Sequence, residues 1–196
     1  PSRKRIILCV NRSLGEMELL QTKLRSFLAQ LKLNGFEIIF IDLPEVSFDY
    51  KTISSTDIRA DITKFLHRYG SDNEPRSFEG LVECYRERPH AHLYGMERLE
   101  DALAMPQIEK SELKKLVQEN VVKARNLINS ILDRYDADFV GFLNFVDWFS
   151  IGGGPSSTLP VSFETKPPIS IMLGWRVGND LALLDIVQEF SEVAKA

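Results

Sequence analysis

The sequence is poor in cysteine and has no excess of basic residues. Only Cys9 and Cys84 occur among its 196 residues. Cys9 lies inside an apolar run, which favours a buried thiol over a disulfide and fits a reducing cytoplasm. The 24 basic residues are outnumbered by 28 acidic ones, for a net charge of −4. This balance argues against a nucleic-acid-binding protein that works through a basic surface.

Long hydrophobic runs are missing as well. No apolar stretch approaches the roughly 20 residues that a membrane-spanning helix needs. The basic residues 1–5 are followed by a short apolar stretch, 6–10, without the longer apolar core and cleavage site of a signal peptide. We therefore expect a cytoplasmic protein. Its 44% hydrophobic and 27% charged residues are typical of a globular chain with a core of its own.

The first third predicts a strand–helix–strand unit. Residues 6–10 form a continuous apolar run, typical of a strand that is covered on both faces. Apolar residues then recur at helical spacing over 16–33, and Asn34-Gly35 ends this helix. A second apolar strand follows over 36–41. Because a helical crossover joins them, the two strands should lie parallel.

The middle of the chain is expected to be helical, and the last third returns to strands. Thr56 and Ser77 are predicted to cap two helices, and a longer helix is expected from Ser111 to about Tyr135. Strands are predicted over 138–143, 159–163 and 169–173, a loop over 151–157 and a closing helix over 180–193. This alternation predicts an α/β protein with a mixed sheet flanked by helices. Without a repeat or composition break, residues 1–196 are expected to form a single domain.

The glycine run Gly152-Gly153-Gly154 invites a phosphate-binding interpretation. However, Pro155-Ser156-Ser157 follows, in place of the Lys-Ser/Thr pair that a phosphate loop requires. The pattern also fails to match the Gly-x-Ser-x-Gly turn of a serine nucleophile. Two interpretations stay open: a close-packed loop where backbone approaches backbone, and a loop that faces a ligand.

No metal site is complete in the sequence. His90 and His92 lack a third ligand at a useful spacing. Asp133, Asp136 and Asp138 are spaced like part of a calcium loop whose glycine and terminal glutamate are missing. We therefore expect surface histidines and a solvated strand entry.

Aromatic residues are densest just before the glycine run. Trp148 and Phe149 are preceded by Asp147 and flanked by Phe142 and Phe145. An aromatic pocket wall with one carboxylate and ordinary core packing both fit this cluster. In addition, Trp175-Arg176 follows the last predicted strand, where ligand sites of α/β sheets often lie.

Several segments together resemble the C-terminal end of amidase-signature enzymes. The turn Gly154-Pro155 leads into the strand TLPVSF at 158–163, which is followed by PISIMLG at 168–174 and by Leu183-Leu184 in the last helix. Upstream, residues 5–10 and 135–140 are similar to earlier segments of the same family. The resemblance covers nearly the whole chain. Residues 147–150, DWFS, also resemble an Asp-x-Phe-Thr motif in which the aspartate helps to hold an amide substrate.

The resemblance implies that this chain is the C-terminal half of such a fold, without the catalytic half. The family cleaves amide bonds with a lysine and two serines, and its nucleophile lies in a Gly/Ser-rich segment that this chain lacks. No catalytic residue, metal or cofactor is therefore assigned here. The residues expected to bind substrate are Asp147, Trp148, Phe149, Gly152, Gly153, Gly154 and Pro155.

Half of a shared sheet should leave an unpaired edge and an uncovered apolar face. We therefore expect a homodimer or a separate chain that supplies the N-terminal half, with the strands at 6–10, 159–163 and 169–173 contributing the surface. The expected function is the substrate-side portion of an amide hydrolase, inactive alone and acting on a small amide once completed. The alternatives are a non-catalytic remnant that serves as a protein-interaction or oligomerisation module, and an unrelated small ligand-binding α/β protein. Neither nucleic acid nor membrane is expected as a partner.

Overall fold

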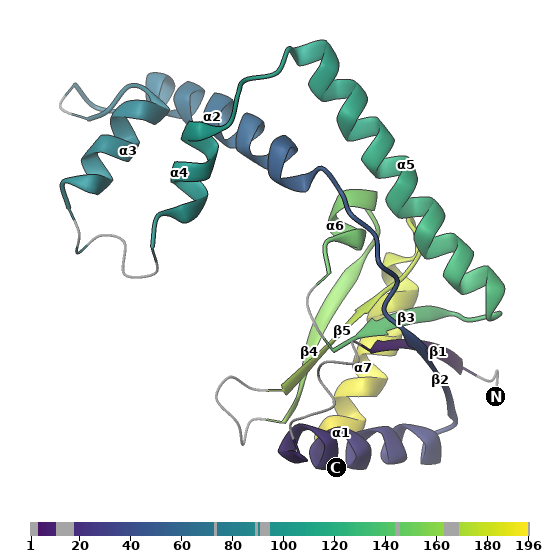
Figure 1. The fold of residues 1–196 in the computed structure, drawn as a ribbon. Helices are drawn as coiled ribbons and strands as arrows, with labels where there is room; N and C mark the ends of the chain where they lie inside the picture. The colour runs from purple at the N-terminus through teal and green to yellow at the C-terminus, as the bar shows by residue number, and fades with distance from the viewer. Residues whose placement is uncertain are drawn as a thin grey trace. The chain divides into compact units, whose positions relative to one another are not determined.

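A computed structural model of the chain describes residues 4–10, 18–72, 74–88, 90, 95–143, 146–162 and 169–195. The chain folds into two compact units, one formed by residues 1–46 and 120–196 and the other by residues 47–119. A single domain over 1–196 stays a prediction. The elements in chain order are β1 (Lys4–Val10), α1 (Glu18–Leu33), β2 (Phe36–Asp42), α2 (Tyr50–Tyr69), α3 (Phe78–Arg86), α4 (Glu97–Ala104), α5 (Lys110–Arg134), β3 (Phe139–Phe142), α6 (Trp148–Gly152), β4 (Ser156–Ser162), β5 (Ile169–Gly174) and α7 (Asp180–Lys195) (Figure 1).

The first unit is built on a five-stranded mixed sheet with the order β2-β1-β3-β5-β4. β1 pairs in parallel with both β2 and β3, so that Ile7 lies opposite Ile39 on one side and Val140 on the other. β5 runs antiparallel to its neighbours β3 and β4. The predicted parallel strand–helix–strand unit and the α/β class with a mixed sheet are confirmed.

Helices cover both faces of this sheet (Figure 1). On one face, α1 and α7 pack over the inward side chains of the strands. Phe190 of α7 is fully buried there, and its ring lies edge-on to Phe36 at 5.1 Å and to Phe27 at 5.8 Å between centroids. On the other face, Phe142 of β3 contacts both aromatic rings of α6. Apolar burial on two faces explains why β1 reads as a continuous apolar run.

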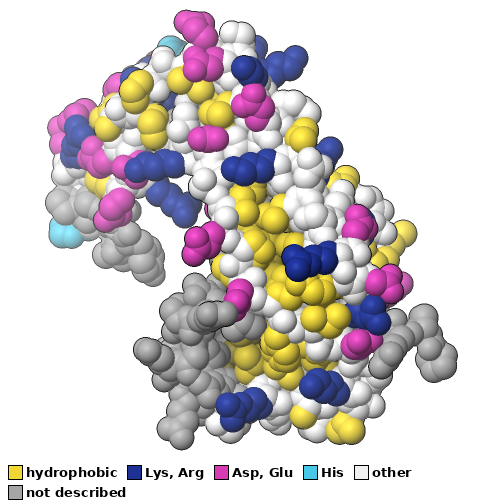
Figure 2. All heavy atoms as spheres, turned by 45° about the vertical axis from the view of Figure 1, so that its right-hand side comes forward, with side chains coloured by type: hydrophobic (Ala, Val, Ile, Leu, Met, Phe, Trp, Pro, Cys, Tyr) yellow, Lys and Arg dark blue, Asp and Glu magenta, His cyan; other side chains and the backbone are white. Residues whose placement is uncertain are grey.

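This two-sided cover corrects one expectation about exposed surface. Residues 6–9 of β1 are at most 2% exposed, and Ile171 and Leu173 of β5 are fully buried. The prediction that the strands at 6–10 and 169–173 present apolar surface is therefore wrong, because both strands lie inside the sheet. The edges are β2 and β4, and Phe40 on β2 is 53% exposed. Figure 2 shows hydrophobic side chains gathered on the forward face of the first unit.

Two predicted element boundaries are also wrong. α2 begins at Tyr50, so Thr56 lies inside the helix, where its hydroxyl donates to the carbonyl oxygen of Thr52 at 2.9 Å. The loop expected over 151–157 shrinks to 153–155, because α6 is a helix of one turn and β4 starts at Ser156. The start of this range was missed because α6 is too short to show a helical period. Its end was missed because Ser156 and Ser157 are polar, although they pair with β5 as part of β4. By contrast, Ser77 caps α3 as predicted, since its Oγ accepts from Gly80 N at 3.1 Å.

The second unit is helical and contains α2, α3, α4 and the start of α5. α4 was not predicted, since it has only eight residues and no side chain caps its start. The small core of this unit consists of Phe78, Val82 and Ala102, all at most 1% exposed. Outside this core, Arg86 of α3 donates to Glu100 of α4 with Nε–Oε1 at 2.8 Å. This guanidinium lowers the pKa of the Glu100 carboxyl below its usual value.

Candidate functional site

The glycine run forms the turn that ends α6. Gly153 adopts a left-handed conformation with φ at 70°, and its N–H donates to the carbonyl oxygen of Phe149. Gly154 N donates to the same oxygen at 2.9 Å. A Cβ at Gly154 would lie 2.8 Å from the carbonyl oxygen of Trp175, so that only glycine fits. The close-packed loop, one of the two interpretations left open, describes this turn.

The same turn also borders a small pocket, so the other interpretation stays open too. The pocket has a volume of about 260 Å³ and is lined by Arg125, Ile128, Asn129, Gly152, Gly154, Trp175, Arg176, Val177 and Asn179. Arg125 Nε donates to the carbonyl oxygen of Gly152 at 2.6 Å. Arg176 donates to Asn129 Oδ1 at 3.3 Å and to Asp133 Oδ1 at 2.6 Å. Guanidinium and amide groups in this arrangement suit a carbonyl or an anion, and they supply no nucleophile.

Of the seven residues expected to bind substrate, only Gly152 and Gly154 line this pocket. Gly153 and Pro155 belong to the turn itself. Trp148 is 5% exposed and Phe149 is fully buried. Their rings lie edge-on to Phe142 at centroid distances of 5.1 and 5.7 Å. In this chain both rings pack in the core, and their action as substrate contacts stays a prediction.

Asp147 lies half-buried at the start of α6. Its carbonyl oxygen accepts from Ser150 Oγ and from Ile151 N, each at 2.9 Å. Its carboxylate has no hydrogen-bond or ion-pair partner among the residues that the structure describes. The carboxylate is therefore available to a ligand, while its proposed role in holding an amide is untested. Phe145, the other flanking aromatic residue, lies outside the described residues.

Sequence reasoning did not find Arg125. The residue lies on α5, far from the glycine run in sequence, and only the fold brings its guanidinium to the end of α6. No local signal marked it, because Arg125 is an exposed charged residue beside the buried stripe of Ala124, Ile128 and Ile131. Trp175 and Arg176, noted for their place after the last strand, do line the pocket.

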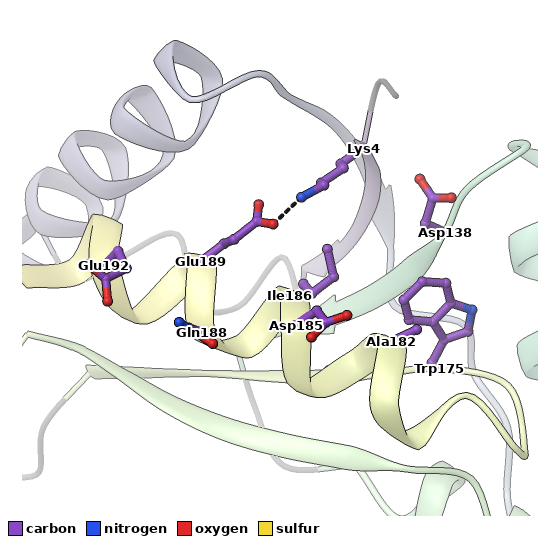
Figure 3. Close-up of a pocket in the computed structure, with 9 residues that line it drawn as sticks. All are labelled: Lys4, Asp138, Trp175, Ala182, Asp185, Ile186, Gln188, Glu189 and Glu192. Carbon is purple, nitrogen blue, oxygen red and sulfur yellow. Dashed lines mark hydrogen bonds and ion pairs between the residues drawn. The ribbon is translucent and has the colours of Figure 1, made fainter. Parts of the chain in front are cut away.

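A larger groove of about 540 Å³ lies beside α7 (Figure 3). Four carboxylates line it, and Lys4 reaches across it to form an ion pair with Glu189. Asp138 is already engaged, because its Oδ2 accepts from Arg5 N at 2.8 Å and so ties β3 to β1. Asp133 is likewise engaged, through its ion pair with Arg176.

No nucleophile with a base is assembled in the described part of the chain. Ser156 is exposed and Ser157 half-buried on β4, and neither hydroxyl bonds a lysine, a histidine or a carboxylate among those residues. The described ranges also contain no cluster of His, Cys, Asp and Glu that could hold a metal ion. His90 is exposed, whereas His92 lies outside these ranges. Within them, no helix has the length and apolar character needed to cross a membrane.

Cys9 is confirmed as a free, buried thiol. The residue lies in β1 and is 2% exposed. Burial disfavours the thiolate and raises the pKa of Cys9 to about 12. Because the thiolate is the reactive form, Cys9 should resist alkylation in the folded protein.

Comparisons with known proteins match the fold but not the sequence. No family model and no curated protein matches this sequence. Among solved structures, an amidase family protein from Bacillus anthracis str. Ames superimposes with a TM-score of 0.82 at 16% identity, over 98% of this chain and 38% of that one. The native peptide amidase from Stenotrophomonas maltophilia matches with a TM-score of 0.77 at 15% identity, over 98% and 43%.

A bacterial aryl acylamidase that belongs to the amidase signature enzymes matches with a TM-score of 0.59 at 14% identity. The match covers 98% of this chain and 45% of that enzyme. The chain thus spans less than half the length of the enzymes it resembles. At such low identity the likeness concerns the fold alone. The five-stranded mixed sheet and its helices therefore match part of the fold of these enzymes.

Proposed function

We propose that residues 1–196 form the substrate-side, C-terminal portion of an amidase-signature amide hydrolase. The observation that carries this proposal is that 98% of the chain superimposes on 38% of one amidase and 43% of another. The remainder of such a fold would supply the lysine and the two serines. In this chemistry the serine oxygen attacks the amide carbonyl carbon, and backbone N–H groups stabilise the resulting oxyanion.

In this proposal the chain contributes by holding a few groups in position beside the substrate. The buried rings of Trp148 and Phe149 anchor α6 against β3. α6 in turn presents the unpaired carboxylate of Asp147 at one end and the glycine turn at the other. A carboxylate that is held in place by a packed helix loses little entropy when it accepts a hydrogen bond from an amide N–H.

We expect residues 1–196 alone to hydrolyse no amide or ester above background. Loss of the catalytic residues removes most of the rate of a serine hydrolase. The measurement is turnover of a panel of aryl amides and p-nitrophenyl esters by the pure chain. Turnover that survives both Ser156→Ala and Ser157→Ala would indicate contamination. Turnover abolished by either change would contradict the proposal, because it would make one of these serines a nucleophile.

In the product of the complete coding sequence, Asp147→Asn is expected to lower kcat/KM for amides by roughly 10-fold to 100-fold. A hydrogen bond to a charged group contributes about 1.5–3 kcal/mol. Asp180→Asn, at the solvent-facing start of α7, is the matched control and should leave kcat/KM unchanged. Equal effects of the two variants would remove Asp147 from the substrate site. An absence of any amidase activity in that product would favour the alternative, a non-catalytic remnant that acts in protein interaction.

We also propose that the isolated chain associates through the open edge of its sheet. Phe40 on the edge strand β2 is 53% exposed. Light scattering should therefore give a mass that rises above 22.4 kDa with concentration. Phe40→Asp should shift the chain to the monomer, whereas Ile58→Asp in the second unit should not. A mass of 22.4 kDa at every concentration would contradict this association.

A further inference from the structure

The second unit contains an apolar groove with no assigned role. The groove lies between α2 and α3 and has a volume of about 530 Å³, within the usual range for a small-molecule site. Its lining includes Phe65 and Tyr69 of α2, Glu74 of the loop that follows, Leu81, Cys84 and Tyr85 of α3, and Arg88. All of these residues belong to the second unit, so the groove is independent of the glycine turn.

The groove exists because α3 is apolar on two sides. Phe78 and Val82 face the core of the unit and are fully buried. Leu81 and Tyr85 face the groove and stay only half-buried. Across from them, Phe65 of α2 is 60% exposed although its ring packs beside that of Tyr69, with a centroid distance of 5.1 Å. Folding of this unit therefore leaves an aromatic surface uncovered.

Arg88 is the cation at this groove. Within the described part of the chain, its side chain has no ion-pair or hydrogen-bond partner. Nearby arginines differ: Arg86 binds Glu83 and Glu100, and Arg59 binds Glu79. A guanidinium without a counter-ion beside apolar walls is complementary to a ligand carboxylate.

Glu74, the acidic residue of the lining, does not neutralise Arg88. Its Oε2 accepts from Ser71 N at 2.7 Å, which holds the carboxylate at the loop after α2. This hydrogen bond is the main cause that lowers the pKa of Glu74 below its usual value. The carboxylate therefore stays engaged with its own backbone.

We propose that this groove binds a small aromatic carboxylate. The ring of the ligand lies between the aromatic walls, and its carboxylate accepts hydrogen bonds from the guanidinium of Arg88. The proposal goes beyond the proposed function and does not rest on it, since no catalytic group takes part.

Cys84 provides a reporter inside the groove. Its thiol is half-buried and lines the groove, whereas Cys9 is buried with its pKa raised. Iodoacetamide should therefore alkylate one thiol per folded chain and two per unfolded chain. A ligand in the groove covers Cys84 and should slow its alkylation in a saturable way.

The test compares naphthalen-2-ylacetate with 2-(naphthalen-2-yl)ethanol, which has the same rings and no charge. We expect the carboxylate to protect Cys84 at concentrations at least about tenfold lower than the alcohol, as a charge-assisted contact requires. Arg88→Gln should abolish this preference and retain protection by the alcohol. Arg98→Gln, an exposed arginine of α4 outside the groove, is the matched control and should keep the preference. Circular dichroism checks that each variant is folded.

Three results would overturn the proposal: no protection by the carboxylate, equal protection by both compounds, or a preference that survives Arg88→Gln. Equal protection would make the groove a general apolar surface, such as a contact between two copies of the chain. Arg88→Lys keeps the positive charge but lacks the planar guanidinium that can donate two parallel hydrogen bonds. This variant should therefore retain part of the preference for the carboxylate. The assay measures no hydrolysis, so its outcome is separate from that of the proposed amidase role.

Discussion

Gly174→Ala is expected to destabilise the first unit by about 3 kcal/mol, the upper part of the usual range for overpacking. A Cβ at this position would overlap the ring of Phe149, which is fully buried and already packed against Phe142. The backbone cannot shift to relieve this overlap, because residue 174 is paired with Val140 on β3 and with Ser156 on β4. Denaturant unfolding followed by tryptophan fluorescence measures the loss, since Trp148 and Trp175 both lie in this unit.

Phe149→Leu provides the control for Gly174→Ala. The smaller side chain leaves space for the new methyl group, so the double variant should be more stable than the sum of the two single effects predicts. Contacting residues commonly couple by about 0.5–3 kcal/mol. Strictly additive effects would show that the cost of Gly174→Ala does not come from the Phe149 ring.

Phe190→Ala should be more damaging still, at about 3–5 kcal/mol. The ring is fully buried, and the rings of three other phenylalanines, Phe27, Phe36 and Phe139, lie within 6 Å of it between centroids. Its removal leaves a cavity where α1, α7 and the sheet meet. Because whole domains are stable by only about 5–15 kcal/mol, this loss is a large share of the total and should clearly lower the midpoint of denaturant unfolding.

Leu184→Ala is the matched control for Phe190→Ala on the same helix. Leu184 is 60% exposed, so its truncation should change the free energy of unfolding by no more than about 0.5 kcal/mol. Similar losses in the two variants would contradict the placement of Phe190 in the core. Phe190→Leu keeps most of the apolar volume, so its loss in the free energy of unfolding should lie between those of the other two variants.

Local patterns in the sequence were enough to predict most elements and the fold class. Three local signals predicted β1, α1 and β2: the apolar run at 6–10, the helical period after it and the glycine at Gly35 that ends the helix. Each depends only on residues that are close together in the sequence. Ser77 was found as a cap for the same reason, since its partner Gly80 is three residues away. Where the local signal was weak, as at the one-turn helix α6 and at Thr56, the prediction failed.

The candidate site depends on contacts that no local pattern encodes. Sequence alone placed Asp147, the two aromatic rings and the glycine turn side by side, and it left open whether the rings face a ligand or the core. The tertiary structure buried the rings, because Phe142 of β3 packs against them, and it brought Arg125 to Gly152 from 27 residues away. It also made β1 an interior strand of the sheet, through pairing with β3 some 130 positions later. Side-chain periodicity records which residues are apolar, but only strand pairing and helix packing decide which of them meet.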